Sequence, residues 1–242
     1  VHDDLIDGAL LRRGARTLNA SWGQAATVLG GDYLFARSAG YSAETGNVRV
    51  VQGFAETLRI ICEGELRQMF SSRQWEQPKD SYYPRIFAKT ASLFCLATQS
   101  GAILAQADPA AESAFYNYGR HLGMAFQIID DILDFTGDES VLGKPVGSDL
   151  RQGTVTLPFF YFMQGNRNAA AIIARLDAGD GHYDEVVAEI VEQVQRSPAI
   201  EQARREACDF AELAKADLEP LRAGANRQAL SDLADFVVAR EA

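Results

Sequence analysis

Six aspartates, arranged as two copies of one short motif, are the side chains of this chain best suited to catalytic chemistry. Each copy has the form Asp-Asp-x-x-Asp; the first spans residues 3–7 and the second spans residues 130–134. Residues four apart lie on one face of a helix, so the first and last carboxylates of a copy would point the same way. One copy alone could be a solvated face, because like charges at that spacing destabilise an isolated helix by only about 0.2–0.5 kcal/mol per pair. Two copies can be brought face to face by folding, which predicts a paired metal site.

The second motif lies in a segment that we expect to be a largely buried helix. Four apolar residues recur there at helical spacing, namely Leu122, Phe126, Ile129 and Leu133. Carboxylates on such a helix must take up protons, pair with bases or bind cations. Mg²⁺ is the expected cation, because it prefers oxygen ligands and often bridges one or two carboxylates to substrate phosphates. Zinc is less suitable, since the three histidines and three cysteines are scattered without ligand spacing.

Basic residues follow each acidic motif. Arg12, Arg13 and Gly14 come after the first copy, and Lys144 comes after the second, in a segment with two glycines. Paired arginines suit the bidentate capture of phosphate oxygens, and a lysine supplies a point charge to the same kind of group. The pattern predicts a polyphosphorylated substrate held by metal and basic side chains. The alternative is that Arg12 and Arg13 only form salt bridges with the aspartates of the first motif.

With these features the chain resembles the trans-isoprenyl diphosphate synthases, also called polyprenyl synthetases. Matching segments run through nearly the whole chain; they are residues 1–14, 30–34, 63–68, 89–91, 126–135, 143–145, 149–154, 157–158 and 230–240. The resemblance implies an all-α, single-domain helical bundle of the isoprenoid synthase type around a central active-site cavity. Residues 1–242 would form one polyprenyl synthetase domain. Family members usually carry helices upstream of the first motif, and we expect these to be missing here.

The resemblance implies an activity and a cofactor. The enzyme would condense an allylic diphosphate with isopentenyl diphosphate, making a longer trans-polyprenyl diphosphate. About three Mg²⁺ ions would bind the allylic diphosphate and assist its ionisation. Three carboxylates would hold these ions, namely Asp3, Asp7 and Asp130. The other three would support that shell, directly or through water, namely Asp4, Asp131 and Asp134.

The resemblance also assigns the remaining site residues. Three basic side chains would complete the allylic diphosphate site, namely Arg12, Lys89 and Lys144. Cations placed there lower the barrier, because negative charge develops on the leaving diphosphate. Thr90 and Gln127 would place dipoles near the allylic carbocation, and Arg13 would hold isopentenyl diphosphate. Read without the resemblance, Lys89 and Thr90 could be ordinary boundary residues of a helix, and Gln127 could be a satisfied core amide.

Two other functions fit some of the same features. A class I terpene cyclase or a squalene-type enzyme could share the bundle and the metal chemistry, although the second acidic motif and the Arg12–Arg13 pair favour chain elongation. A noncatalytic partner subunit of a prenyl synthase is the other alternative, which the six intact aspartates disfavour. The resemblance alone implies a homodimer.

Composition is typical of a cytoplasmic enzyme. The 242 residues, 47% of them hydrophobic, are enough for one domain with a substantial core. A net charge of −10 argues against nucleic acid as a partner. Three cysteines without regular spacing favour a reducing compartment. No apolar run approaches the roughly 20 residues needed to cross a bilayer, so we expect no integral membrane segment.

Apolar periodicity predicts helices nearly throughout. The clearest segments are residues 50–61, 83–104, 115–135 and 183–194. Turn formers predict breaks at residues 77–80, 108–109, 137–147, 165–168 and 178–181. The charged, alanine-rich tail from Ile200 predicts a surface helix pair that closes one end of the bundle.

Two features bear on the length of the product. The first motif has a spacer of two residues, Leu5 and Ile6, which resembles medium- and long-chain synthases more than the farnesyl type. Small side chains at Ala91, Ser92 and Cys95 would leave room for a growing chain. We therefore expect a product of geranylgeranyl length or longer.

Overall fold

The structure is a computed structural model that describes residues 1–12, 14–137, 145–164, 166–178 and 182–240. Helices form nearly all of its regular structure: α1 (His2–Ile6), α2 (Leu18–Glu44), α3 (Val48–Ser71), α4 (Tyr82–Ile86), α5 (Ser92–Leu104), α6 (Pro109–Thr136), α8 (Ser148–Arg151), α9 (Leu157–Gln164), α10 (Ala169–Asp177), α11 (Tyr183–Gln195), α12 (Ala199–Asp217) and α13 (Ala225–Ala239). A 3₁₀ turn, η1 (Lys79–Ser81), precedes α4, and a π-helical turn, η2 (Phe87–Ala91), joins α4 to α5. The all-α class predicted from the sequence is confirmed.

The helix boundaries follow from local sequence signals. Asp108 caps α6 by accepting a hydrogen bond from the Ala111 amide at 2.8 Å, and Pro109 stands at the first helical position. Proline suits that position because its missing N–H would have no partner there. Asn47 caps α3 in the same way, through the Arg49 amide at 3.0 Å. These caps confirm the predicted break at residues 108–109 and place the start of α3 two residues before the apolar periodicity begins.

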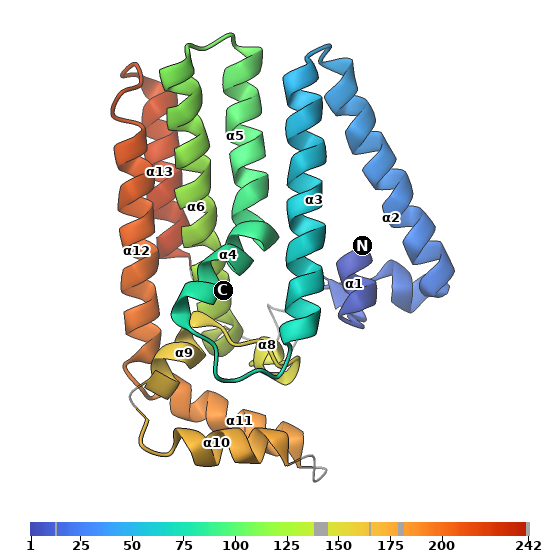
Figure 1. The fold of residues 1–242 in the computed structure, drawn as a ribbon, viewed down its shortest axis with the longest axis vertical. Coiled ribbons are helices and arrows are strands. Elements are labelled where there is room, and N and C mark those ends of the chain that lie inside the picture. Colours follow the sequence, from blue (N-terminus) through green and yellow to red (C-terminus); the bar gives the residue numbers. More distant parts are fainter. Residues whose placement is uncertain (13, 138–144, 165, 179–181, 241–242) are drawn as a thin grey trace.

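Helix α6 is the centre of the bundle. It packs between α5 on one side and α12 on the other, with α13 behind α12 (Figure 1). Gly119 and Gly123 of α6 let the backbone of α5 and η2 approach closely, because a Cβ at either position would collide with Phe94 or Ala91. Ala91 is fully buried in this contact, and Cys95 lies buried one turn further along. The small residues of this segment therefore serve close helix packing, and the prediction that they leave room for a product is wrong.

Helix α12 corrects a second expectation. Its alanines lie at helical spacing and are fully buried against α6 and α13, at Ala203, Ala207, Ala211 and Ala214. Small side chains on one face allow two helices to approach closely, so an alanine stripe can form a core contact with few large residues. The tail from Ile200 is thus partly a core element and not only a surface pair.

Helices α10 and α11 form a lower layer across the ends of α6, α9 and α12 (Figure 1). Their apolar faces meet Phe135 and Leu150 in one buried cluster. Trp75 joins the same cluster from the segment after α3, and its indole N–H donates to Asp177 at 2.8 Å. This cluster fixes the lower end of α6, where the second acidic motif lies.

A polar cluster anchors η1 and α4, the turns that lead to η2. The Lys79 ammonium group donates to Glu206 of α12 and to the Tyr161 hydroxyl of α9, both at 2.6 Å. The Tyr83 hydroxyl also donates to Glu206. Burial lowers the pKa of Lys79, but the hydrogen bonds outweigh that effect and the pKa is raised. Residues 79–83 are therefore tied to two helices of the core.

At the other edge, α2 extends away from the bundle beside α3 (Figure 1). Many of its large apolar side chains are exposed, among them Trp22, Leu29, Tyr33 and Leu34. In the parts of the chain that the structure describes, no helix combines the length and apolar character needed to span a membrane.

Candidate functional site

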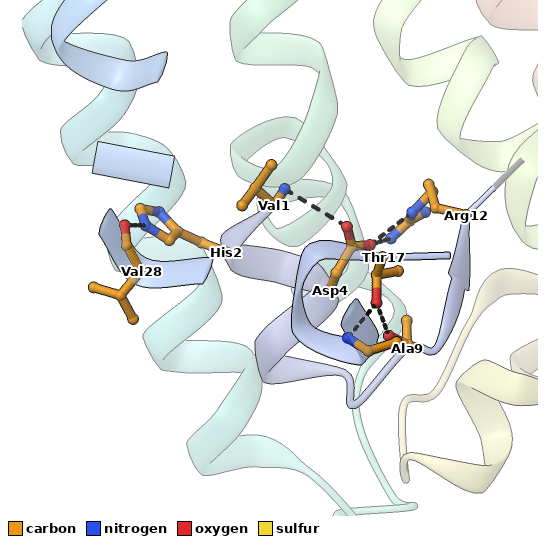
Figure 2. A network of polar contacts seen from close by, with 8 residues as sticks. Val1, His2, Asp4, Ala9, Arg12, Thr17 and Val28 are labelled. Atoms are coloured by element: carbon orange, nitrogen blue, oxygen red, sulfur yellow. Dashed lines mark hydrogen bonds and ion pairs between the residues drawn. The ribbon is translucent and has the colours of Figure 1, made fainter. Parts of the chain in front are cut away.

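The first acidic motif occupies α1, a five-residue helix in which only one of the three aspartates is buried. Asp3 and Asp7 are exposed, whereas Asp4 is buried. Asp4 accepts hydrogen bonds from Arg12, with 2.8 Å to Nε and 2.7 Å to Nη2 (Figure 2). The alternative interpretation of the sequence is that Arg12 forms salt bridges with the first motif. Arg12 does form one, with Asp4. The two acids predicted to share a face, Asp3 and Asp7, do share the exposed side.

A short hairpin places Arg12 over α1. Its strands are β1 (Leu11–Arg12) and β2 (Ala15–Arg16), paired antiparallel with Arg12 opposite Ala15. Thr17 fastens this hairpin to α2, because its hydroxyl donates to the Ala9 carbonyl at 2.8 Å and accepts from the Ala20 amide at 3.1 Å (Figure 2). The same hydroxyl is therefore both the cap of α2 and a fixed point for the segment that carries Arg12.

His2 serves packing between α1 and α2. Its ring bonds the Val28 carbonyl of α2, with 3.0 Å between Nε2 and the oxygen (Figure 2). The ring lies so close to Gly31 that any Cβ there would collide with it. Gly31 is thus required for α1 to dock, and His2 acts as a structural residue of the first motif.

The second acidic motif occupies the last turns of α6, and its three aspartates have three different surroundings. Asp130 is exposed, and one of its oxygens lies 3.9 Å from the Arg240 guanidinium after α13. Asp134 is 2% exposed and accepts from the Asp149 amide of α8 at 3.0 Å. The Asp134 carbonyl accepts from Gly147 at 2.7 Å. Asp134 therefore holds the start of α8 against α6.

Asp131 is the centre of a buried chain of hydrogen bonds. Its Oδ2 accepts from the Tyr82 hydroxyl of α4 at 2.8 Å, and its Oδ1 accepts from the Gln127 side-chain amide at 2.8 Å. Thr90 of η2 in turn donates to the carbonyl oxygen of the Gln127 side chain. The predicted pair Thr90 and Gln127 is thus brought together, and Gln127 is a satisfied amide at the same time.

The pKa of Asp131 is raised to about 7, and burial is the largest cause. The nearby charge of Asp149 raises it further, while the hydrogen bonds from Gln127 and Tyr82 oppose the rise. Two donors therefore compensate only part of the cost of burying this carboxylate.

Lys89, also in η2, lies within electrostatic reach of acids from four elements. Burial lowers its pKa, but the charges of Asp149, Glu65, Asp131 and Asp7 raise it, and the net direction is upward. Asp149, Glu65 and Asp131 come from α8, α3 and α6, and Asp7 is the residue that ends α1. The lysine is therefore flanked by acids of both motifs. Their charges favour its protonated form, which is the form that can bind a phosphate group.

The acids around Lys89 repel one another. Although the Asp7 side chain is exposed to solvent, the protein around it partly desolvates the carboxyl and raises its pKa. Asp3 and Asp149 raise this pKa further, against the lowering by Lys89 and Arg12. The pKa of Glu65 is raised by burial and by Asp3 and Asp7, although Lys89 lowers it. An excess of negative charge that the protein itself does not neutralise favours the binding of a cation.

The donor set fits Mg²⁺ better than a metal that needs a preformed cage. Within the described residues, no three His, Cys, Asp or Glu side chains converge closely enough to hold an ion between them. Mg²⁺ commonly takes one or two carboxylates and completes its shell with water and substrate phosphates. The exposed carboxylates of Asp3, Asp7 and Asp130 fit that requirement, because water and substrate phosphates could complete the shell of an ion bound to them.

Sequence reasoning missed four residues of this region. Tyr82 and Asp149 contact the second motif, Glu65 lies in the acid group around Lys89, and Arg240 faces Asp130. The Arg240 guanidinium also lies 4.2 Å from the centre of the Phe126 ring. The resemblance of residues 63–68 and 230–240 was the only available signal for Glu65 and Arg240. Arg13 and Lys144, both predicted to bind substrate, lie outside the described residues.

A cavity of about 820 Å³ lies between α3, α4, η2 and α6. Ala88, which precedes Lys89, and Met124, one turn before Gln127, form part of its wall. Arg67 and Arg120 lie at its polar side. The motif aspartates, all of which the structure describes, are not part of this wall.

Comparisons with known proteins point to one family. The family model described as polyprenyl synthetase matches residues 1–194. A heptaprenyl diphosphate synthase component 2 of Geobacillus stearothermophilus is 41% identical over 241 residues, which cover 100% of this chain and 74% of the relative.

Two solved structures share the fold over the whole chain. The heptaprenyl diphosphate synthase from Staphylococcus aureus has a TM-score of 0.95 at 33% identity, covering 100% of this chain and 75% of its own. A polyprenyl synthase from Caulobacter crescentus, complexed with calcium and isoprenyl diphosphate, has a TM-score of 0.93 at 38% identity, covering 100% of this chain and 74% of its own.

Proposed function

Because the chain belongs to the polyprenyl synthetase family and is a prenyltransferase of that family, we propose how its described residues carry out chain elongation. An allylic diphosphate loses its diphosphate to leave an allylic cation. The double bond of isopentenyl diphosphate attacks that cation, a carbon–carbon bond forms, and a proton is lost. The observation that carries the proposal is Lys89, a cation flanked by acids of both motifs.

We assign the metal to the exposed acids, Asp3, Asp7 and Asp130. About three Mg²⁺ ions would bind there together with the substrate and would supply charge stabilisation to the departing diphosphate. Exposure supports this choice, because a carboxylate that already serves as a hydrogen-bond acceptor inside the protein is less accessible to an ion. Asp4, Asp131 and Asp134 then act behind the metal ligands.

We assign the allylic diphosphate to Arg12 and Lys89. Two nitrogens of Arg12 face Asp4, but a guanidinium carries five N–H donors, so others remain for phosphate oxygens. Asp4 fixes the direction of this side chain before substrate arrives, which reduces the ordering that binding requires. Lys144 would add a third cation to the same group, and Arg13 would hold isopentenyl diphosphate, as the family resemblance implies.

We propose a product longer than geranylgeranyl. Both heptaprenyl synthases described above match this chain over its full length. The two-residue spacer of the first motif agrees with this assignment. The relatives compared are synthases, so a terpene cyclase is not favoured. Geranylgeranyl diphosphate or a shorter product as the longest species, seen by mass spectrometry of the products, would contradict this part of the proposal.

We propose that a second copy of the chain covers the exposed apolar side of α2. Large exposed apolar side chains on one helix are typical of an interface, and Leu29, Tyr33 and Leu34 provide them. The name of the Geobacillus relative, component 2, points to a different partner as the alternative. Light scattering of the purified protein distinguishes the two, because a homodimer has twice the chain mass without any added protein. We also place the enzyme in the cytosol, where its three free cysteines would stay reduced.

Turnover tests the proposed reaction. The protein is incubated with radiolabelled isopentenyl diphosphate, an allylic diphosphate and Mg²⁺, and the labelled products are extracted. We expect elongated products that require both Mg²⁺ and the allylic substrate. Conversion of the allylic substrate alone, with no label incorporated, would identify a cyclase instead.

A further inference from the structure

The hydrogen bonds that connect Tyr82, Asp131, Gln127 and Thr90 all point toward Asp131. Each oxygen of the Asp131 side chain accepts a hydrogen bond, so both of its neighbours act as donors. The Tyr82 hydroxyl does so from α4, and Gln127 does so with its NH₂ group. The Gln127 carbonyl oxygen is then turned away from Asp131, and Thr90 donates its hydroxyl hydrogen to that oxygen.

This direction determines what Thr90 offers to a substrate. A hydroxyl has one hydrogen and two lone pairs. Because the hydrogen is used on Gln127, the lone pairs are free to face the carbon that becomes positive. If the Gln127 amide were reversed, its NH₂ group would face Thr90 and would occupy a lone pair instead.

The surroundings of Asp131 argue for this role. Asp131 is 3% exposed, whereas the Asp130 side chain is 56% exposed. Each Asp131 oxygen already has a protein donor at 2.8 Å. Tyr82 is 4% exposed and lies in the buried cluster with Ile128 and Ile132, so its hydroxyl has no water to replace the carboxylate.

We propose that Tyr82 and Asp131 are positioning residues, which orient the Gln127 amide so that Thr90 presents its lone pairs to the allylic cation. The inference rests on the proposed chain elongation, and it gives the second aspartate of the second motif a role other than metal binding. The assignment follows from the connected contacts of four side chains on three elements, α4, η2 and α6.

The first test removes the Tyr82 hydroxyl. We expect Tyr82→Phe to lower kcat about tenfold, because one buried hydrogen bond to a charged group is lost. The KM for the allylic substrate and the Mg²⁺ concentration for half-maximal rate should stay within about twofold of wild type, since no group that touches either is changed. Tyr83→Phe is the matched control, because Tyr83 donates to Glu206 and not to Asp131. Unchanged kcat in Tyr82→Phe, or a shifted Mg²⁺ requirement, overturns the proposal.

The second test reverses the Gln127 side-chain amide and then restores an acceptor for the Thr90 hydroxyl. In Asp131→Asn, we expect Tyr82 to keep donating to the remaining oxygen, which places the new NH₂ group opposite Gln127 and flips the Gln127 amide. We expect kcat to fall about 10- to 100-fold. In the double variant Gln127→Glu/Asp131→Asn, the new carboxylate at position 127 again accepts from Thr90, and the net charge equals that of wild type. We expect kcat to recover at least about fivefold over the single variant, a gain of about 1 kcal/mol in transition-state stabilisation.

The outcomes separate the inference from the proposed function. A wild-type protein that incorporates no isopentenyl diphosphate contradicts the proposed function. An active wild type with a double variant no better than Asp131→Asn contradicts the inference, since a metal ligand or a purely structural residue would not be rescued by moving the carboxylate to position 127. The exchange of side chains of nearly equal size also keeps the test available if Tyr82→Phe fails to fold.

Discussion

The two acidic motifs have the same sequence pattern but different surroundings. In the first, on the short surface helix α1, the outer aspartates Asp3 and Asp7 are exposed and only Asp4 is buried. In the second, on the buried helix α6, only Asp130 is exposed. The first aspartate is exposed and the second is buried in both copies, so the copies differ at the third position, Asp7 against Asp134. The surrounding elements make that difference, because Asp134 accepts the Asp149 amide of α8, whereas Asp7 remains exposed to solvent.

The largest effect should come from removing an exposed acid of the first motif. We expect Asp3→Asn to lower kcat/KM about 10³-fold, because metal-assisted charge stabilisation contributes several kcal/mol. Its melting temperature should match that of wild type, since the side chain is exposed. Asp4→Asn is the matched variant within the same helix and should lose less activity than Asp3→Asn. Equal losses of activity, measured by steady-state kinetics, would break the distinction between exposed and buried acids.

At Asp134 of the second motif, we expect the substitution to reduce stability, in contrast to Asp3→Asn. We expect Asp134→Ala to lower the free energy of unfolding by about 1–3 kcal/mol, because a buried side chain is removed and the Asp149 amide loses its acceptor. Urea unfolding followed by circular dichroism measures this change. A stability equal to that of wild type, together with a large loss of activity, would make Asp134 a metal ligand and contradict the comparison.

The pH dependence of stability should reveal Asp131. Its carboxyl has a pKa of about 7 in the folded protein, above its ordinary value of 3.8. The folded state therefore binds the proton of Asp131 more tightly than the unfolded state does. The stability that this proton contributes is complete below about pH 4 and is lost as the pH rises through about 7. As the pH is raised from about 5 to about 8, the stability of the Asp131→Asn variant should fall less than that of wild type. Thermal unfolding at each pH measures this difference. If the stability of both proteins changed with pH in the same way, the raised pKa of a buried Asp131 carboxyl would be contradicted.

The smallest effect on stability should come from Arg12. Its side chain is 57% exposed, so the ion pair with Asp4 should contribute at most about 1 kcal/mol to folding. We expect Arg12→Lys to melt within a few degrees of wild type. Its KM for the allylic diphosphate should rise, because a lysine cannot bind Asp4 and phosphate oxygens through one planar group. A large loss of stability with an unchanged KM would make the pair structural.

The fold could be predicted from the sequence where the signal was local. The apolar spacing of residues 115–135 and the Asp108–Pro109 start together predicted α6, because periodicity and capping depend on neighbours in the chain. The role of α12 could not be predicted, since its alanine stripe becomes part of the core only by packing against α6. The close approach of η2 to Gly123 escaped prediction for the same reason.

The candidate site divides in the same way. Motif spacing predicted that Asp3 and Asp7 share a face, and the family resemblance supplied Lys89, Thr90 and Gln127. The contact between Tyr82 and Asp131 joins residues 49 apart in the chain, and no local pattern marks Tyr82. Burial of Asp131 beside an exposed Asp130 also depends on how α4 packs against α6, which spacing alone does not specify.

The Mg²⁺ requirement of two neighbouring variants tests the central claim most directly. Asp130→Asn and Asp131→Asn change adjacent residues by the same few atoms, and the rate of each is measured over a range of Mg²⁺ concentrations. Removing a direct ligand should raise the half-saturating Mg²⁺ concentration by at least about tenfold, because Mg²⁺ takes only one or two protein carboxylates and each one lost removes a large part of its binding energy. We predict this rise for Asp130→Asn, and for Asp131→Asn a lower maximal rate with the requirement within about threefold of wild type. A larger shift for Asp131→Asn than for Asp130→Asn would contradict the assignment of the exposed acids to the metal.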